Sequence, residues 1–232
     1  MWFRSTGARL TMDVTVKRLL KQDIFGRVEM VEREDARMIR RAAIGGNLPG
    51  TSLVARRLAA REQKILTRLR DLSGVPKPLG VEDGTLFYRS YIEGLPLYEA
   101  GKSVAVSYWD DLMSLAEKCH AAGVTHNDLA KEANILVTPE GRPAFIDFQV
   151  ATYFPHDSRL LRRLAAMLRR EDRRHLLKHK ALYRPDLLTA AEREALAKKS
   201  LPVRVWSATA MKPYQRVIIW LGWEEASGPR SR

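Results

Sequence analysis

The sequence predicts an α+β protein with two lobes, in which an antiparallel β-sheet lobe carrying one helix is followed by a mainly helical lobe. Two observations predict this arrangement. Five strand-like segments and one inserted helical segment fill residues 14–93, and helical patterns dominate residues 94–232. Residues 1–13 precede the first strand and are expected to form an N-terminal extension. A cleft is expected between the lobes, which residues 91–96 connect.

Short apolar runs bounded by turn residues predict the strands of the first lobe. The turn Asp23-Ile24-Phe25-Gly26 predicts an antiparallel hairpin, and Asp83-Gly84 is a strong signal for a second one. The expected strands cover residues 14–19, 28–31, 36–42, 78–82 and 85–92.

The inserted helix is expected to begin with Ser52 as its cap and to run to about Leu72. Its apolar stripe has the helical spacing and consists of Leu58, Ile65, Leu66 and Leu69. Glu62 falls on the same face, four residues after Leu58 and three before Ile65. A carboxylate on a buried face needs a cationic partner, because an unpaired buried charge is costly.

The second lobe begins with a helix whose apolar stripe includes Trp109, Leu112 and Cys119, and Gly123 is expected to end it. Two short strands at 135–138 and 144–148 follow, and residues 158–199 are expected to form basic helices. Cys119 is the only cysteine, so its place on the stripe predicts a core residue in a reducing cytoplasm.

The net charge of +13 favours polyanionic partners such as an anionic membrane surface, a phosphorylated glycolipid or nucleic acid. Between residues 157 and 200, 13 Lys and Arg stand against 6 Asp and Glu. A nucleic-acid-binding module is one alternative, but no recognition motif accompanies the charge, so no specific nucleic acid is expected. The sequence contains neither an apolar membrane-spanning run nor a secretion signal, which predicts a cytoplasmic protein, with peripheral contact at the inner membrane left open.

The chemistry is concentrated in two segments, His126 to Val137 and Ile146-Asp147-Phe148. The pattern H-x-D, N-I-L-V and D-F resembles the catalytic loop and metal-binding motif of protein-kinase-like enzymes. It is most similar to the small bacterial kinases related to RIO kinases and to lipopolysaccharide-core (Kdo/heptose) kinases. Asn134 and Asp147 are 13 residues apart, the usual separation in that superfamily. The resemblance extends from about Thr15 to Tyr153.

The resemblance implies ATP and Mg²⁺ as cofactors and a role for each matching residue. Asp128 would orient or deprotonate the acceptor hydroxyl, and Lys131 would reach the transferring phosphate. Asn134 and Asp147 would hold the metal, since carboxylate and amide oxygens suit Mg²⁺. His126 would brace the loop.

Upstream, Arg37-Met38-Ile39-Arg40 lies where the superfamily has V-A-I-K. The resemblance makes Arg40 the phosphate-contacting cation and Glu62 its anchor. Glu93 would fall at the hinge that meets the adenine, where its backbone matters more than its carboxylate.

Several features depart from the superfamily. The sequence has no G-x-G-x-x-G loop, Asp128 and Asn134 are six residues apart, one more than usual, and Gln149 replaces the glycine of D-F-G. No A-P-E-bounded activation segment follows, so regulation by phosphorylation of such a segment is not expected. Arginine in place of lysine is not a conservative change at a phosphate site.

Three functions follow as hypotheses. The first is a kinase that transfers the γ-phosphate of ATP to a hydroxyl of a protein serine or threonine, and the second is a kinase for a lipopolysaccharide-core sugar. The third, prompted by Arg40 and Gln149, is a nucleotide-binding pseudokinase scaffold. Near the C-terminus, aromatic residues beside cations predict a segment that docks on the helical lobe, or alternatively one that lies in a membrane interface: Trp206, Tyr214, Trp220 and Trp223.

Overall fold

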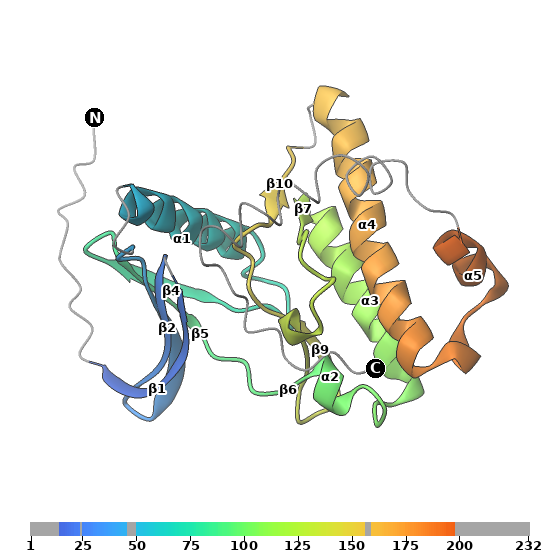
Figure 1. Ribbon diagram of the computed structural model, residues 1–232, viewed down its shortest axis with the longest axis horizontal. Helices are drawn as coiled ribbons and strands as arrows, with labels where there is room; N and C mark the ends of the chain where they lie inside the picture. Colours follow the sequence, from blue (N-terminus) through green and yellow to red (C-terminus); the bar gives the residue numbers. More distant parts are fainter. Residues whose placement is uncertain (1–13, 24, 46–49, 156–158, 198–232) are drawn as a thin grey trace. The chain divides into compact units, whose positions relative to one another are not determined.

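The computed structural model describes residues 14–23, 25–45, 50–155 and 159–197. The predicted α+β class is confirmed (Figure 1). The chain divides into two compact units, residues 1–187 and residues 188–232. The predicted extension at residues 1–13 and the aromatic segment from Trp206 to Trp223 lie outside the described residues.

The first unit begins with a five-stranded antiparallel sheet in the order β1-β2-β3-β5-β4. The third strand has the bounds that the sequence predicts. Gly26 opens the second strand with φ 135°, and a Cβ there would lie 1.9 Å from the Ala42 carbonyl oxygen, so the hairpin requires glycine. The strands are β1 (Thr15–Asp23), β2 (Gly26–Arg33), β3 (Ala36–Ala42), β4 (Pro78–Glu82) and β5 (Leu86–Ser90).

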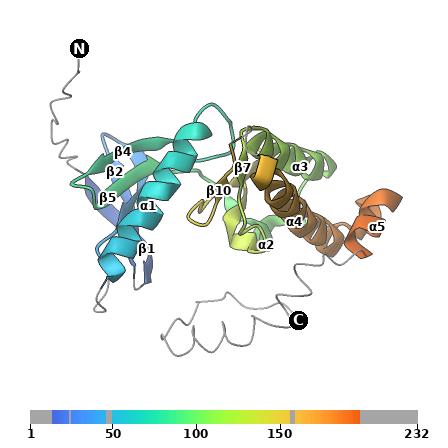
Figure 2. The ribbon, with the colours of Figure 1, turned by 90° about the horizontal axis from the view of Figure 1, so that it is seen from above.

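Helix α1 (Thr51–Arg68) lies along the sheet and contacts β4 and β5 (Figures 1 and 2). Its N-cap is Gly50 with φ 82°, not the predicted Ser52, because the chain enters the helix through a left-handed turn that glycine tolerates. The helix also ends earlier than predicted, at Arg68 instead of Leu72. Glu62 lies on its buried face, as predicted.

The chain then enters a helical region with short strands. Strands β6, β8 and β9 form one small antiparallel sheet, and β7 pairs with β10. The two long helices, α3 and α4, pack against each other (Figure 2). The elements are β6 (Leu95–Pro96), α2 (Leu97–Ala100), α3 (Val106–Ala121), β7 (Val124–Thr125), η1 (Glu132–Asn134), β8 (Ile135–Val137), β9 (Pro143–Phe145), β10 (Thr152–Tyr153), α4 (Arg159–Tyr183) and η2 (Pro185–Leu187).

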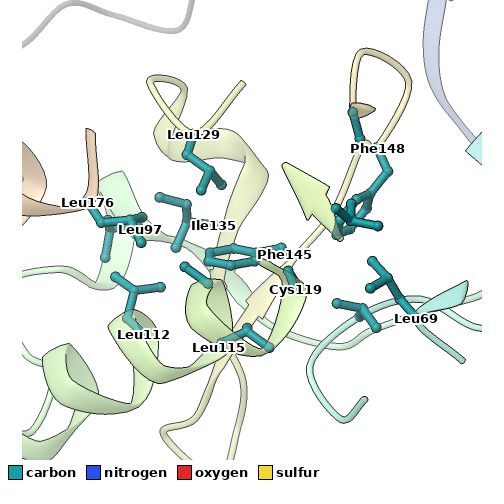
Figure 3. Close-up of a cluster of buried hydrophobic side chains, with 14 of the residues drawn as sticks. Leu69, Leu97, Leu112, Leu115, Cys119, Leu129, Ile135, Phe145, Phe148 and Leu176 are labelled. Atoms are coloured by element: carbon teal, nitrogen blue, oxygen red, sulfur yellow. The ribbon is translucent and has the colours of Figure 1, made fainter. Parts of the chain in front are cut away.

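The main hydrophobic core lies between α3 and the small sheet. Phe145 of β9 is surrounded by side chains that include Leu112 and Leu115 of α3 (Figure 3). The predicted stripe of α3 is confirmed, and Cys119 is a core residue with 3% of its surface exposed. Leu69 and Phe148 belong to the same core, so apolar packing connects the end of α1 with the segment that carries Asp147.

The second unit contains one described helix, α5 (Ala190–Ala197). Thr189 and Glu192 form a reciprocal capping box, in which each backbone N–H donates to the other residue's side-chain oxygen. Among the helices that the structure describes, none combines the length and the apolar character needed to span a bilayer.

Candidate functional site

The loop between β7 and β8 brings three of the predicted site residues into direct contact. Asp128 Oδ2 accepts a hydrogen bond of 2.8 Å from Asn134 Nδ2 and lies 3.2 Å from Lys131 Nζ. Asn134 Nδ2 also donates to the Asp128 backbone carbonyl at 3.0 Å. Because both of these hydrogen bonds use the amide nitrogen, the side-chain oxygen of Asn134 is the atom that can coordinate a cation.

Asp147 lies in a strained part of the backbone, with φ 63°. Non-glycine residues held in the left-handed region cluster at functional sites, where the surrounding structure fixes them. The residue after Asp147, Phe148, is buried. In the residue before Asp147, Ile146, both backbone groups form hydrogen bonds: the N–H donates to the Asn134 carbonyl at 3.0 Å, and the carbonyl accepts from His126 Nε2 at 3.0 Å. The backbone of Asp147 is thereby tied to the loop of Asp128.

The Asp147 carboxylate has a buried oxygen, Oδ1, with no hydrogen-bond partner among the described residues. An unsatisfied buried acceptor is costly and calls for an explanation. A bound cation would supply the missing partner. Burial lowers the pKa of neighbouring His126, so its ring is neutral at pH 7, and it donates Nε2–H to the Ile146 carbonyl as a brace.

Asp172 of α4 holds the backbone of the loop that carries Asp128 in place, and it was not among the residues that the sequence predicted for the site. Its Oδ2 accepts from the His126 N–H at 2.8 Å, and its Oδ1 accepts from the Asn127 N–H at 2.9 Å. The ring Nε2 of His120 lies 3.0 Å from Oδ2. Asp172 is 1% exposed and lies seven residues after buried Ala165 and four before buried Leu176, a signal that the sequence contained.

Replacing Asp172 with alanine is expected to destabilise the protein by at least about 2 kcal/mol, because two buried backbone donors lose their acceptor at about 1–3 kcal/mol each. The midpoint of urea unfolding measures this. Asp186→Ala is the control, since Asp186 is exposed and bonded only locally to Arg184 in the contacts described. We expect Asp186→Ala to leave the midpoint unchanged. An unchanged midpoint for Asp172→Ala would contradict the anchoring role.

Glu62 has two arginine partners, neither of which is the predicted one. Its Oε2 lies 3.4 Å from Nη1 of Arg41 on β3, and its Oε1 forms an ion pair with Nη1 of Arg89 on β5. Arg40 donates instead through Nε and Nη2 to Glu29 Oε2, at 2.9 and 2.7 Å. The predicted ion pair between Arg40 and Glu62 is therefore not formed.

The reason is strand alternation. Successive side chains of a strand point to opposite faces of the sheet, so a shift of one residue moves a side chain to the other face. Arg41 is on the face that α1 covers, with 8% of its side chain exposed, whereas Arg40 is on the opposite face with Glu29. The arginine that faces α1 is therefore Arg41, one residue after the predicted Arg40.

Two residues of α1, Arg61 and Arg68, contact the segment after Asp147. Arg61 donates to the Ala151 carbonyl and to Thr152 Oγ1, both at 2.9 Å. Thr152 Oγ1 also accepts from Asn127 Nδ2 at 3.0 Å. Arg68 lies over the ring of Tyr153, 3.8 Å from its centroid, a cation–π contact.

Glu93, predicted at the hinge, lies in the connection between β5 and β6. Its carboxylate is 62% exposed and 3.9 Å from Arg37 Nη1. Gly94 beside it packs tightly, since a Cβ there would lie 2.8 Å from the Val137 carbonyl oxygen. The carboxylate of Glu93 thus faces solvent and Arg37.

The side-chain oxygen atoms of Asn134 and Asp147 suit a hard cation such as Mg²⁺. No group of three or more His, Cys, Asp or Glu side chains that could hold a metal lies within the described part of the chain. Mg²⁺ does not require such a group, because it is commonly held by one or two protein oxygens together with substrate phosphates and water. Asn134 and Asp147 fit this kind of site.

Comparison with known proteins does not assign the chain to a family. A scan against protein-family models finds no match, and a search of curated proteins finds no similar sequence.

Proposed function

We propose that the protein is an ATP- and Mg²⁺-dependent phosphotransferase with a protein-kinase-like fold. The observation that carries the proposal is the tying together of Asp128, Asn134 and Asp147, with the buried Asp147 Oδ1 left for a cation. Arg41 and Arg89, which pair with Glu62 on the buried face of α1, are the cations that would meet the phosphates in this proposal.

The proposed reaction gives each residue one task. Asp128 orients the acceptor hydroxyl and takes its proton as the oxygen–phosphorus bond forms and the bond from the γ-phosphorus to ADP breaks. Asn134 and Asp147 hold the cation, which when bound neutralises charge on the phosphates. Lys131, whose Nζ lies 3.2 Å from Asp128 Oδ2, contacts the transferring phosphate in this proposal. Glu62 orients the arginines toward the nucleotide.

A protein serine or threonine is the first candidate acceptor. A phosphorylated glycolipid of the lipopolysaccharide-core type is the second, and α4 favours it: this helix carries nine Lys and Arg against two Asp and Glu. Arg162, Arg163 and Arg170 are exposed on it. Such a basic helix attracts anionic acceptors.

The test is a transfer assay with γ-labelled ATP and Mg²⁺, run side by side against extracted membrane glycolipid and total protein. We expect label to appear in one of the two. If the protein binds nucleotide but shows neither transfer nor hydrolysis, the proposal of an enzyme is overturned and the pseudokinase scaffold is favoured. Absence of nucleotide binding would overturn both.

A further inference from the structure

The C-terminal end of α4 holds the middle of the loop that carries Asp128. The ring Nε2 of His179 lies 2.8 Å from the carbonyl oxygen of Leu129, and the hydroxyl of Tyr183 donates a hydrogen bond to Glu132 Oε2. These contacts come in addition to the two hydrogen bonds from the middle of α4 to the backbone just before Asp128. The loop is therefore fixed to one helix on both sides of Asp128.

Packing fixes the position of the Tyr183 ring. The ring stacks on buried Trp109 of α3, with the centroids 6.2 Å apart and the ring planes at 23° to each other. Gly101 leaves room for it, since a Cβ there would lie 2.9 Å from two of its ring carbons. Burial and the hydrogen bond to Glu132 raise the pKa of the Tyr183 phenol, so it remains protonated and acts as a donor at neutral pH. The hydroxyl therefore holds the Glu132 carboxylate from a fixed place.

The ring of His179 spans the loop between Leu129 and Glu132. Burial lowers the pKa of His179, so the ring is neutral at pH 7. Because a carbonyl oxygen can only accept, Nε2 carries the proton and donates it to the Leu129 carbonyl. The other ring nitrogen, Nδ1, lies 3.8 Å from Glu132 Oε1. The two oxygens of the Glu132 carboxylate thus face two different side chains of α4, which sets the orientation of this carboxylate.

Lys131 lies between the two loop residues that α4 holds. Its backbone carbonyl accepts a hydrogen bond of 3.0 Å from the Asn134 N–H, and its Nζ lies 3.2 Å from Asp128 Oδ2. Because the Lys131 side chain is 48% exposed, its place depends on the backbone from which it starts. Support of this kind matters for rate, because a displacement of about 1 Å at a reacting group can cost about 10²-fold.

We propose that Tyr183 is a positioning residue for phosphate transfer, which acts through Glu132 to set the place of Lys131 beside Asp128. This inference rests on the proposed function and deepens it. Its consequence is that one hydroxyl at the end of α4, 51 residues after Glu132 in the chain, controls the rate of transfer by acting on Lys131.

Tyr183→Phe removes this hydroxyl and keeps the stacked ring. It is expected to lower the single-turnover rate of transfer from γ-labelled ATP about 10-fold, measured with whichever fraction takes the label, extracted membrane glycolipid or total protein. In a Lys131→Met background, which is slower on its own, the same substitution should cost less than about twofold, because the group that Tyr183 positions is already absent. A hydroxyl that only stabilises the fold would cost the same factor in both backgrounds.

Tyr98→Phe is the matched control. Tyr98, on α2, also hydrogen-bonds a glutamate, the neighbouring Glu99, but it is 52% exposed. Its loss of a hydroxyl should leave the rate of transfer unchanged in both backgrounds.

A second pair of variants tests the connection through Glu132. Glu132→Gln keeps an oxygen acceptor for the Tyr183 hydroxyl and should transfer phosphate at close to the wild-type rate. Glu132→Ala removes the acceptor and should lose about as much as Tyr183→Phe. If Tyr183→Phe does not fold, as judged by circular dichroism, or if Lys131→Met is too slow to measure, the comparison of the two Glu132 variants decides.

The outcomes distinguish this inference from the function on which it rests. If the wild type transfers phosphate to neither fraction, the proposed function and the inference fall together. If the wild type transfers phosphate and Lys131→Met or Tyr183→Phe is equally fast, only the inference is overturned. The same holds if Tyr183→Phe costs the same factor with and without Lys131, or if the two Glu132 variants transfer at the same rate.

Discussion

Asp147→Asn is expected to abolish metal-dependent nucleotide binding and phosphate transfer. The substitution keeps the size of the side chain and removes its negative charge, so the partnerless Oδ1 becomes a neutral and weaker ligand. Removing a group that only orients a metal ligand typically lowers metal affinity or activity about 10- to 100-fold. Removing the charge of the ligand itself should therefore reduce the transfer rate at least about 100-fold. Titration calorimetry with Mg²⁺ and a nucleotide analogue measures the binding, and γ-labelled ATP measures the transfer.

The control for Asp147→Asn is Asp83→Asn. Asp83 also has a left-handed backbone, with φ 49° against 63° for Asp147, but it lies in the exposed turn between β4 and β5. Asparagine tolerates this conformation, so neither substitution should disturb the fold through its backbone. Full metal-dependent binding by Asp147→Asn would remove the central residue of the proposed site.

The second large effect is expected for Asp128→Asn, which should lower the rate of transfer by about 10²- to 10⁴-fold, the range for loss of a positioned general base. Nucleotide affinity should stay near that of the wild type, because the role proposed for Asp128 concerns the acceptor and not the nucleotide. Single-turnover transfer of labelled phosphate measures the rate, and calorimetry measures the affinity.

Asp111→Asn, on the exposed surface of α3, is the matched control for Asp128→Asn and should transfer phosphate at the wild-type rate. A rate for Asp128→Asn equal to that of the wild type would exclude its role as base. A parallel loss of affinity and rate would instead indicate a damaged loop, because Asn134 Nδ2 donates to the carboxylate that is changed.

Local patterns allowed much of the fold to be predicted. The third strand has its predicted bounds because apolar residues and turn residues specify it over a few positions. The stripe that includes Trp109 and Cys119 predicted α3 because helical periodicity is also local. The start of α1 was missed, because a left-handed glycine replaces the polar cap that the sequence suggested at Ser52.

The site was harder to predict where its contacts depend on which face a side chain occupies. Asp128, Asn134 and Asp147 could be chosen from the sequence because they match the H-x-D, N-I-L-V and D-F pattern, with a hairpin between Asn134 and Asp147. The choice between Arg40 and Arg41 depends on one step of strand alternation, which the neighbouring residues leave ambiguous. Arg89 comes from β5, about 50 residues further along, and only the strand pairing brings it to Glu62.

The hydroxyl of Thr152 connects helix α1 with the loop that carries Asp128. It receives one hydrogen bond from Arg61 of α1 and another from Asn127, the neighbour of Asp128. A tilt of α1 that withdraws Arg61 would therefore also weaken the support of the loop that carries Asp128. Glu62, the next residue on the helix, would withdraw from its arginines in the same movement. In the proposed phosphotransferase, the residues assigned to the nucleotide and those assigned to the acceptor would therefore lose their support together.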